Sequence, residues 1–228
     1  MTYRSFLVCI LFLLTQFMGF AQTINQQKDS LLAQINTVET KDKVLLYDSV
    51  SRLYWGINPD SSLHYAELAF EFAKKTGDKL SIGDAFNSLG NAYSALGKRD
   101  KALENYEQSL QHRQAGGDML KVAYSLNNIA LIYNEQNKYS EAINAYKEAA
   151  SICNELDQYD DEALMLIGIA ETYNIINNKT NALEYAIKAA SLFIHIDNKF
   201  GLAVAFNLIG HLHKDLKNNT LALEYYKK

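Results

Sequence analysis

The sequence predicts an all-α fold, a right-handed α-solenoid built from antiparallel helix pairs. Residues of the same type recur every forty positions, and the apolar residues within each repeat follow helical spacing. The chain has 228 residues but a single proline, Pro59. Because proline interrupts helices, its scarcity favours long helices joined by short connections.

The repeat becomes visible when the chain is aligned with itself at a spacing of forty residues. One aromatic position comprises Tyr93, Tyr133 and Tyr173, and His213 continues this series. The same spacing links two series of small residues, Gly90, Ala130, Ala170 and Gly210, and Ala102, Ala142, Ala182 and Ala222. The sequence therefore predicts a solenoid over residues 43–228, with repeats at 43–78, 79–118, 119–158, 159–198 and a truncated 199–228.

Each repeat is predicted to contain two helices. Phe86, Leu89, Gly90 and Tyr93 lie on one face of a first helix, and the segment that starts near Ala102 forms a second. The small residues allow close approach between helices, and the large tyrosines fill the remaining space. On this interpretation Tyr133 belongs to the core, and Tyr133→Ala is expected to cost about 3–5 kcal/mol.

The helix boundaries also recur at the same spacing. Residues that can cap a helix N-terminus stand just before each predicted second helix, at Asp60, Asp100, Ser140, Thr180 and Thr220. Residues that tolerate a left-handed conformation, Gly97, Asn137 and Asn177, are predicted to end the first helices. Turns between successive repeats are predicted at 77–78, 117–118, 157–158 and 197–198.

The motif Phe86-x-x-Leu89-Gly90-x-x-Tyr93, followed by Ala102-x-x-x-Tyr106, resembles the tetratricopeptide-repeat (TPR) family. The resemblance covers residues 43–228. Two features differ from the usual pattern, because the period is forty residues and no repeat ends in proline. Both features predict longer second helices, similar to the extended-repeat branch of the family. HEAT or armadillo repeats match the period but not the placement of the small residues and tyrosines.

The N-terminus has the pattern of a signal peptide over residues 1–21. Arg4 precedes an apolar run at 6–14, and Gly19 and Ala21 suit a cleavage site after Ala21. A nine-residue run is too short to span a bilayer, although an uncleaved anchor is the alternative. The protein is therefore predicted to be exported, periplasmic or secreted, or else anchored in the inner membrane facing the periplasm. Residues 22–42 are predicted to form a capping helix and linker.

The sequence favours binding over catalysis. A net charge of −4 provides no basic excess for nucleic acid. His211 and His213 point to different helix faces, which makes them a poor metal pair, and His213 occupies the tyrosine position of the core. No nucleophile has a matched base, and no phosphate-binding loop is present. We therefore expect no enzymatic activity, no metal and no cofactor.

The family resemblance implies that the first helices line a concave groove for a protein or an extended peptide. Asparagine amides there could hydrogen-bond a peptide backbone, and a merely solvated polar face is the alternative. A family groove that clamps a C-terminal carboxylate also uses cations, which are missing here. The predicted binding residues are Asn87, Asn91, Tyr124, Asn127, Asn128, Leu131, Asn134, Glu171, Asn174 and Asn207.

Two functions are compatible with these features. The first is an extracytoplasmic scaffold that binds proteins or peptides. The second is the truncated sensor region of a larger bacterial signalling protein, with a histidine kinase or a DNA-binding regulator downstream. The chain resembles the N-terminal region of exported or membrane-tethered TPR sensors, and its last predicted helix is short and lacks a polar cap. Membrane contact is expected only through an uncleaved signal segment or a downstream anchor.

Overall fold

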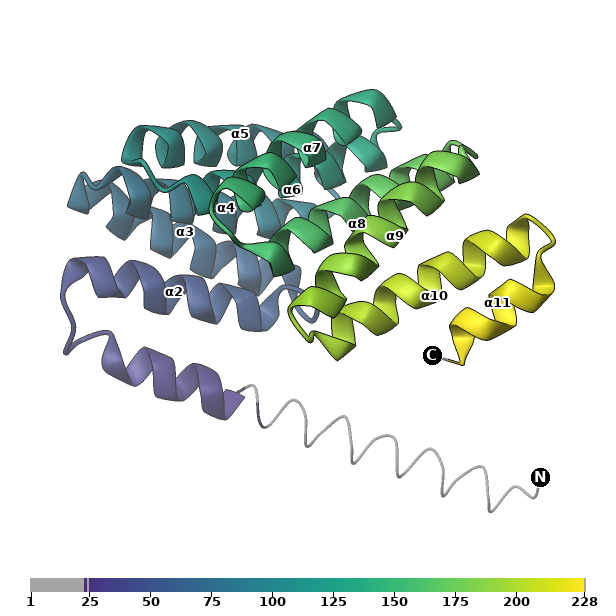
Figure 1. The fold of residues 1–228 in the computed structure, drawn as a ribbon. Helices are drawn as coiled ribbons and strands as arrows, with labels where there is room; N and C mark the ends of the chain where they lie inside the picture. Colours follow the sequence, from purple (N-terminus) through teal and green to yellow (C-terminus); the bar gives the residue numbers. More distant parts are fainter. Residues whose placement is uncertain (1–22, 24, 228) are drawn as a thin grey trace, which may run out of the picture. The chain divides into compact units, whose positions relative to one another are not determined.

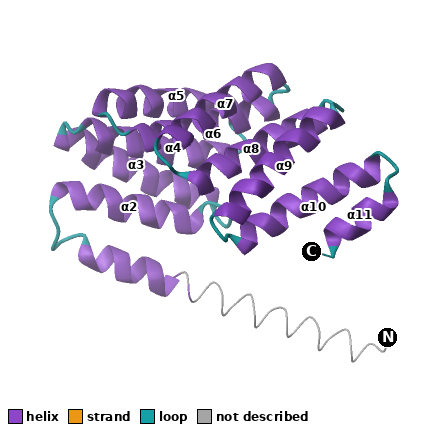
Figure 2. Cartoon of the chain, viewed as in Figure 1, coloured by secondary structure: helices purple, strands orange, loops and turns teal. Residues whose placement is uncertain are grey.

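The computed structural model describes residues 23 and 25–227, and every regular element among them is a helix (Figures 1 and 2). The prediction of an all-α fold is confirmed. Within these residues, no helix is both long and apolar enough to cross a membrane. The predicted signal peptide, residues 1–21, lies outside the described residues. The chain divides into two compact units, with the boundary after Gly97.

The first unit contains a helix over residues 25–34 and three longer helices, α2 (Thr40–Tyr54), α3 (Pro59–Thr76) and α4 (Lys79–Ala95). Helix α2 contacts both α3 and α4. Two small clusters of buried residues hold these helices together, one around Val44 and Ala69 and the other around Ala66 and Leu89. The predominance of alanine allows the helix axes to come close together.

The second unit contains seven helices, and each contacts the next along the chain. A single buried cluster runs from Val122 to Leu212 and includes the fully buried Tyr146 and Phe193. Its helices are α5 (Arg99–Gly116), α6 (Met119–Glu135), α7 (Tyr139–Glu155), α8 (Tyr159–Ile175), α9 (Lys179–His195), α10 (Lys199–Asp215) and α11 (Asn219–Tyr226). The second helices α3 and α5 have 18 residues each, and helices α4 and α6 to α10 have 17 each.

Residues with positive φ end most of the helices. The predicted left-handed residues Gly97, Asn137 and Asn177 have φ values of 69°, 60° and 60°. The first residue of each predicted turn between repeats is also left-handed, at Gly77, Gly117, Asp157 and Asp197. Lys217 extends the first of these series with φ 62°. The forty-residue register therefore located these reversals correctly.

The predicted N-caps of the second helices were wrong by two residues. The capping positions are Asn58, Lys98, Lys138, Asn178 and Asn218. A single left-handed residue, such as Gly97, reverses the chain, so the next residue already serves as the cap. Asp60, Asp100, Ser140, Thr180 and Thr220 consequently lie at the second position inside their helices. Several first helices have a side-chain cap, for example Asp78, which accepts hydrogen bonds from the amide (3.1 Å) and hydroxyl (2.6 Å) of Ser81.

We expect Asp78→Ala to lower the free energy of unfolding by about 1 kcal/mol at pH 7, because the start of α4 loses its cap. The hydrogen bond from the Ser81 hydroxyl lowers the pKa of Asp78. This contribution is therefore complete above the ordinary aspartate pKa of about 3.9 and is lost as the pH falls through the lowered folded-state value. Urea unfolding at several pH values measures it. Ser140→Ala is the control and should change the free energy of unfolding by less than about 0.5 kcal/mol. A larger loss would indicate that Ser140 caps α7 after all.

Candidate binding surface on the first helices

The first helices of successive repeats lie against one another in the second unit. Helix α8 contacts α10 directly. The Tyr124 hydroxyl of α6 donates to Asp161 of α8 at 2.9 Å, which links the first two of these helices as well. Because the first helices are this close together, their exposed sides form one surface of the second unit. We call it the inner surface and define it by Tyr124, Asn127, Leu131, Leu164, Glu171, Val204, Asn207 and His211.

Four of the ten predicted binding residues are exposed on this surface. Tyr124 and Leu131 of α6 are 36% and 48% exposed. Glu171 of α8 and Asn207 of α10 are also exposed, whereas Asn127 and Asn128 are half-buried. Two further predicted residues, Asn87 and Asn91, lie on α4 in the first unit, where both side chains are half-buried. The second unit therefore provides a continuous candidate surface of its own.

Two of the predicted residues, Asn134 and Asn174, have structural contacts instead. The Asn134 amide donates to the Thr172 hydroxyl at 2.8 Å, and this hydroxyl donates to the carbonyl of Gly168 at 2.7 Å. Asn174 accepts a hydrogen bond from Lys179. Asn134 therefore connects α6 to α8, and Asn174 connects α8 to α9. Replacing either residue would test helix packing as much as ligand binding.

The inner surface also has apolar residues that the sequence analysis did not assign to it. Leu164 is 48% exposed and Val204 is 39% exposed. Both lie in the forty-residue register of Tyr124, so the three form an apolar row across α6, α8 and α10. The register identifies both positions, but the sequence alone does not show that their side chains are exposed. A ligand on this surface meets apolar side chains and amides together.

Local burial changes the protonation of two groups on the inner surface. Burial, and secondly the hydrogen bond to Asp161, raises the pKa of Tyr124 to about 12, so this tyrosine is neutral at physiological pH. Burial alone raises the pKa of Glu171, although its side chain still reaches solvent. A carboxylate surrounded by protein on several sides loses part of its hydration, which disfavours the charged form.

Reactive groups in the described residues do not form a recognisable catalytic or metal centre. No group of histidine, cysteine and acidic side chains within them is arranged to hold a metal ion. Cys153 is fully buried, and burial raises the pKa of its thiol to about 11. The thiol is therefore protonated near neutral pH and is a poor nucleophile. The inner surface offers apolar contact and hydrogen bonding, which suit binding.

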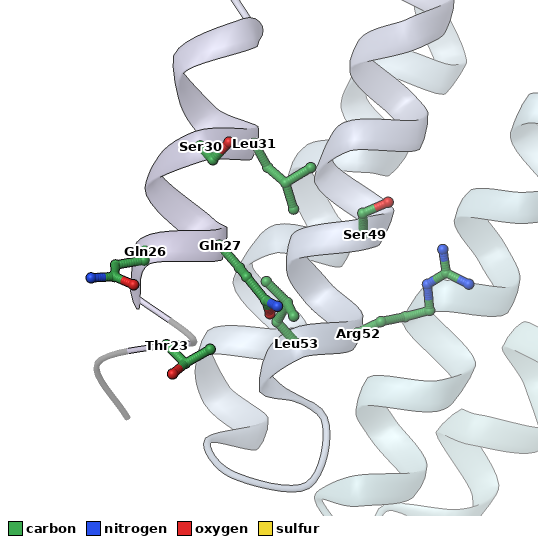
Figure 3. A pocket seen from close by; sticks show the side chains of 8 residues that line it. All are labelled: Thr23, Gln26, Gln27, Ser30, Leu31, Ser49, Arg52 and Leu53. Atoms are coloured by element: carbon green, nitrogen blue, oxygen red, sulfur yellow. The ribbon is translucent and has the colours of Figure 1, made fainter. Parts of the chain in front are cut away.

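The first unit contains a cavity of about 670 Å³ between the helix at 25–34 and α2. Gln27 and Leu53 extend toward each other between the two helices (Figure 3). Arg52, at one edge, forms an ion pair with Asp48 at 3.3 Å. The full lining is Thr23, Gln26, Gln27, Ser30, Leu31, Ser49, Arg52 and Leu53. These side chains are a mixture of amides, hydroxyls, leucines and one arginine and do not indicate one kind of ligand. The inner surface therefore remains the stronger candidate.

Comparisons with known proteins agree with the repeat. Models described as "Tetratricopeptide repeat" match residues 81–155, 121–193 and 203–228. The response regulator aspartate phosphatase A of Bacillus subtilis is 38% identical over 52 residues, which are 23% of this chain and 14% of that protein. This matching segment is thus a small part of the relative.

Two solved structures share the fold. One is a signal transduction ATPase with numerous domains (STAND) from Pyrococcus horikoshii, which has a tetratricopeptide-repeat sensor. Its TM-score is 0.73 at 20% identity, covering 96% of this chain and 34% of that chain. The other is a Rap protein complexed with Competence and Sporulation Factor, with a TM-score of 0.67 at 17% identity, covering 93% of this chain and 70% of that chain. Likeness at these identities shows an α-solenoid of helix pairs.

Proposed function

Because the chain belongs to the tetratricopeptide-repeat family, we propose that it is a binding scaffold that holds an extended protein or peptide segment on the inner surface. One observation carries the proposal. The exposed apolar side chains of Leu131 and Leu164 share the inner surface with amides, of which Asn207 is exposed and Asn127 half-buried. Apolar side chains give affinity by leaving water, and amides can both donate to and accept from a peptide backbone.

The similar structures support this choice of ligand. The Rap structure is described as a complex with Competence and Sporulation Factor, so a related helical stack accommodates a bound factor. The proposed role needs no reacting group, and we propose that the chain itself does not catalyse a reaction.

We further propose that the scaffold acts outside the cytoplasm. The support is the N-terminal pattern of Arg4, the apolar run at 6–14, and Ala21. N-terminal sequencing of the mature protein tests this location. A first residue of Gln22 agrees with export, whereas an intact N-terminus in the cytoplasmic fraction contradicts it.

The second candidate function is the sensor region of a larger signalling protein. The STAND protein favours it, because its tetratricopeptide repeats are described as a sensor and this chain spans 34% of that protein. In that case the same inner surface receives the signal, and a separate effector domain responds to it. Reading the genomic frame beyond the codon for Lys228 distinguishes the two candidates.

We expect Leu131→Ala to weaken binding of peptides selected on the inner surface about tenfold, or about 1.4 kcal/mol, because part of a leucine contact is lost. Suitable probes are fluorescent peptides selected by the wild-type chain from a random ten-residue library, and anisotropy titration measures their affinity. Ile187→Ala is the matched control, because Leu131 and Ile187 are both 48% exposed but Ile187 lies on a second helix, α9. Equal effects of the two substitutions, or no effect of either, would argue against the inner surface.

A further inference from the structure

The acidic residues of α6, α8 and α10 are paired with one exception. Five of the six have a hydrogen-bond or ion-pair partner, at distances of 2.6–3.0 Å: Glu135 with Arg99, Asp160 with Asn198, Asp161 with Tyr124, Glu162 with Asn154, and Asp215 with Lys179. Glu171 is the sixth, and within the described residues its carboxylate has neither kind of partner. An unpaired charge on an otherwise paired surface is available to a ligand.

The position of Glu171 on the inner surface favours recognition of a ligand over simple solvation. It lies on the middle of three first helices, in register with Leu131 on α6 and His211 on α10. On its own helix, Leu164 stands two turns before it and Ile175 one turn after it, and these side chains are 48% and 56% exposed. Apolar residues on three sides therefore flank the carboxylate. Its raised pKa, caused by burial, agrees with this partial loss of water.

Two lysines at the starts of α9 and α6 have carboxylate partners of their own. Lys179 forms its contacts with Asp215 at 2.6 Å and with Asn174. Lys121 is 4.0 Å from Asp118. Within the described residues Glu171 forms no ion pair, so a ligand can supply the complementary charge.

We propose that Glu171 binds the basic side chain of a lysine or arginine in the bound segment, so that the inner surface selects extended peptides in which apolar residues flank a basic one. This inference rests on the function proposed above. A side chain fits better than a terminal amine, because exposed side chains of the inner surface, Leu131 on α6 and His211 on α10, lie on both sides of Glu171. The segment can therefore pass over Glu171 without ending there.

The helix spacing predicts the arrangement of these peptide residues. Packed neighbouring helices have axes about 8–10 Å apart, and an extended chain advances roughly 3.3 Å per residue. A peptide residue on Leu131 and the basic residue on Glu171 are therefore separated by at least roughly three positions. The expected ligand has an apolar residue at least about three positions from a lysine or arginine.

The test is a selection from a random ten-residue peptide library on the purified chain and two variants. We expect wild type to enrich lysine or arginine near apolar residues and Glu171→Gln to lose the basic enrichment. Glu148→Gln is the control, since it removes the same charge from an exposed position on the second helix α7. An N-acetylated synthetic copy of a selected peptide should bind Glu171→Gln at least tenfold more weakly than wild type, because a charge-assisted contact is lost.

A double-mutant cycle assigns the contact. Replacing the basic residue of the peptide with norleucine should weaken binding to wild type by the same factor and have little further effect on Glu171→Gln. Selected peptides that are sensitive to Leu131→Ala but not to Glu171→Gln overturn this inference and leave the proposed function standing. If binding is insensitive to both substitutions, the proposed function and this inference are both wrong. Loss of binding on N-acetylation assigns the cation to a terminal amine, and tighter binding to Glu171→Gln indicates an acidic ligand; either result overturns the proposed side-chain contact.

Discussion

Tyr146→Ala is expected to lower the free energy of unfolding by about 3–5 kcal/mol, as large aromatic truncations in cores do. Only 2% of this side chain is exposed, and its ring lies against Gly168 on the next first helix. A Cβ atom at position 168 would come within 2.7 Å of the ring. Removing the ring therefore leaves a cavity where α7 meets α8. Urea unfolding followed by circular dichroism measures the loss.

Tyr133→Ala is the matched control for this prediction. The sequence placed Tyr133 in the core with the same expected cost, but its side chain is only half-buried and packs at the edge of the core. The Lys138 ammonium lies 5.6 Å from the centre of its ring. We now expect about 1–2 kcal/mol for Tyr133→Ala, because less surface returns to water. A cost for Tyr133→Ala equal to that for Tyr146→Ala would contradict this ranking of the two tyrosines.

Gly201→Ala should destabilise the second unit by about 1–3 kcal/mol, the usual cost of overpacking. Alanine normally favours a helix over glycine by about 1 kcal/mol, so the expected sign is the reverse of the ordinary one. A methyl group at position 201 would overlap the ring of Phe193, whose Cζ atom would lie 2.7 Å away. Phe193 is only 1% exposed and has little room to move. Thermal and urea unfolding both test the sign.

Two controls isolate the contact between position 201 and Phe193. Gly56→Ala should leave stability nearly unchanged, because no atom lies within 4 Å of a Cβ there. In a Phe193→Leu background, Gly201→Ala should cost less than in wild type, since the smaller side chain makes room. Identical costs in the two backgrounds would show that the ring of Phe193 is not the obstacle.

The helices and their reversals were predictable because the repeat specifies them locally. The left-handed residues Gly97, Asn137 and Asn177 were identified from residue type and register alone. The N-caps were harder to predict from the sequence, because the number of residues in a chain reversal depends on backbone geometry. Lys138 is a cap only because Asn137 completes the turn before it. A preference for serine and threonine at caps therefore pointed two residues too far, to Ser140.

The candidate site could be predicted only in part for a similar reason. The register placed Leu131, Glu171 and Asn207 on one face of the first helices. It could not show that Asn134 donates to Thr172, since this contact joins residues from different repeats. Leu164 and Val204 were missed because exposure of an apolar side chain depends on how far neighbouring helices are separated. Hydrogen bonds between repeats and the exposure of side chains depend on how the helices pack together.

The uninterrupted core of the second unit has a consequence for signal transmission. Each helix there is held mainly by its neighbours, and stability in such repeat arrays is approximately a sum of nearest-neighbour terms. A segment bound across α6, α8 and α10 would bridge several of these interfaces at once, and binding to the folded state alone stabilises it. A bound segment would therefore make the helices of the second unit unfold and refold together, as one cooperative block. The scaffold could thereby report a bound ligand as a change in stiffness along its length, with no change in its fold.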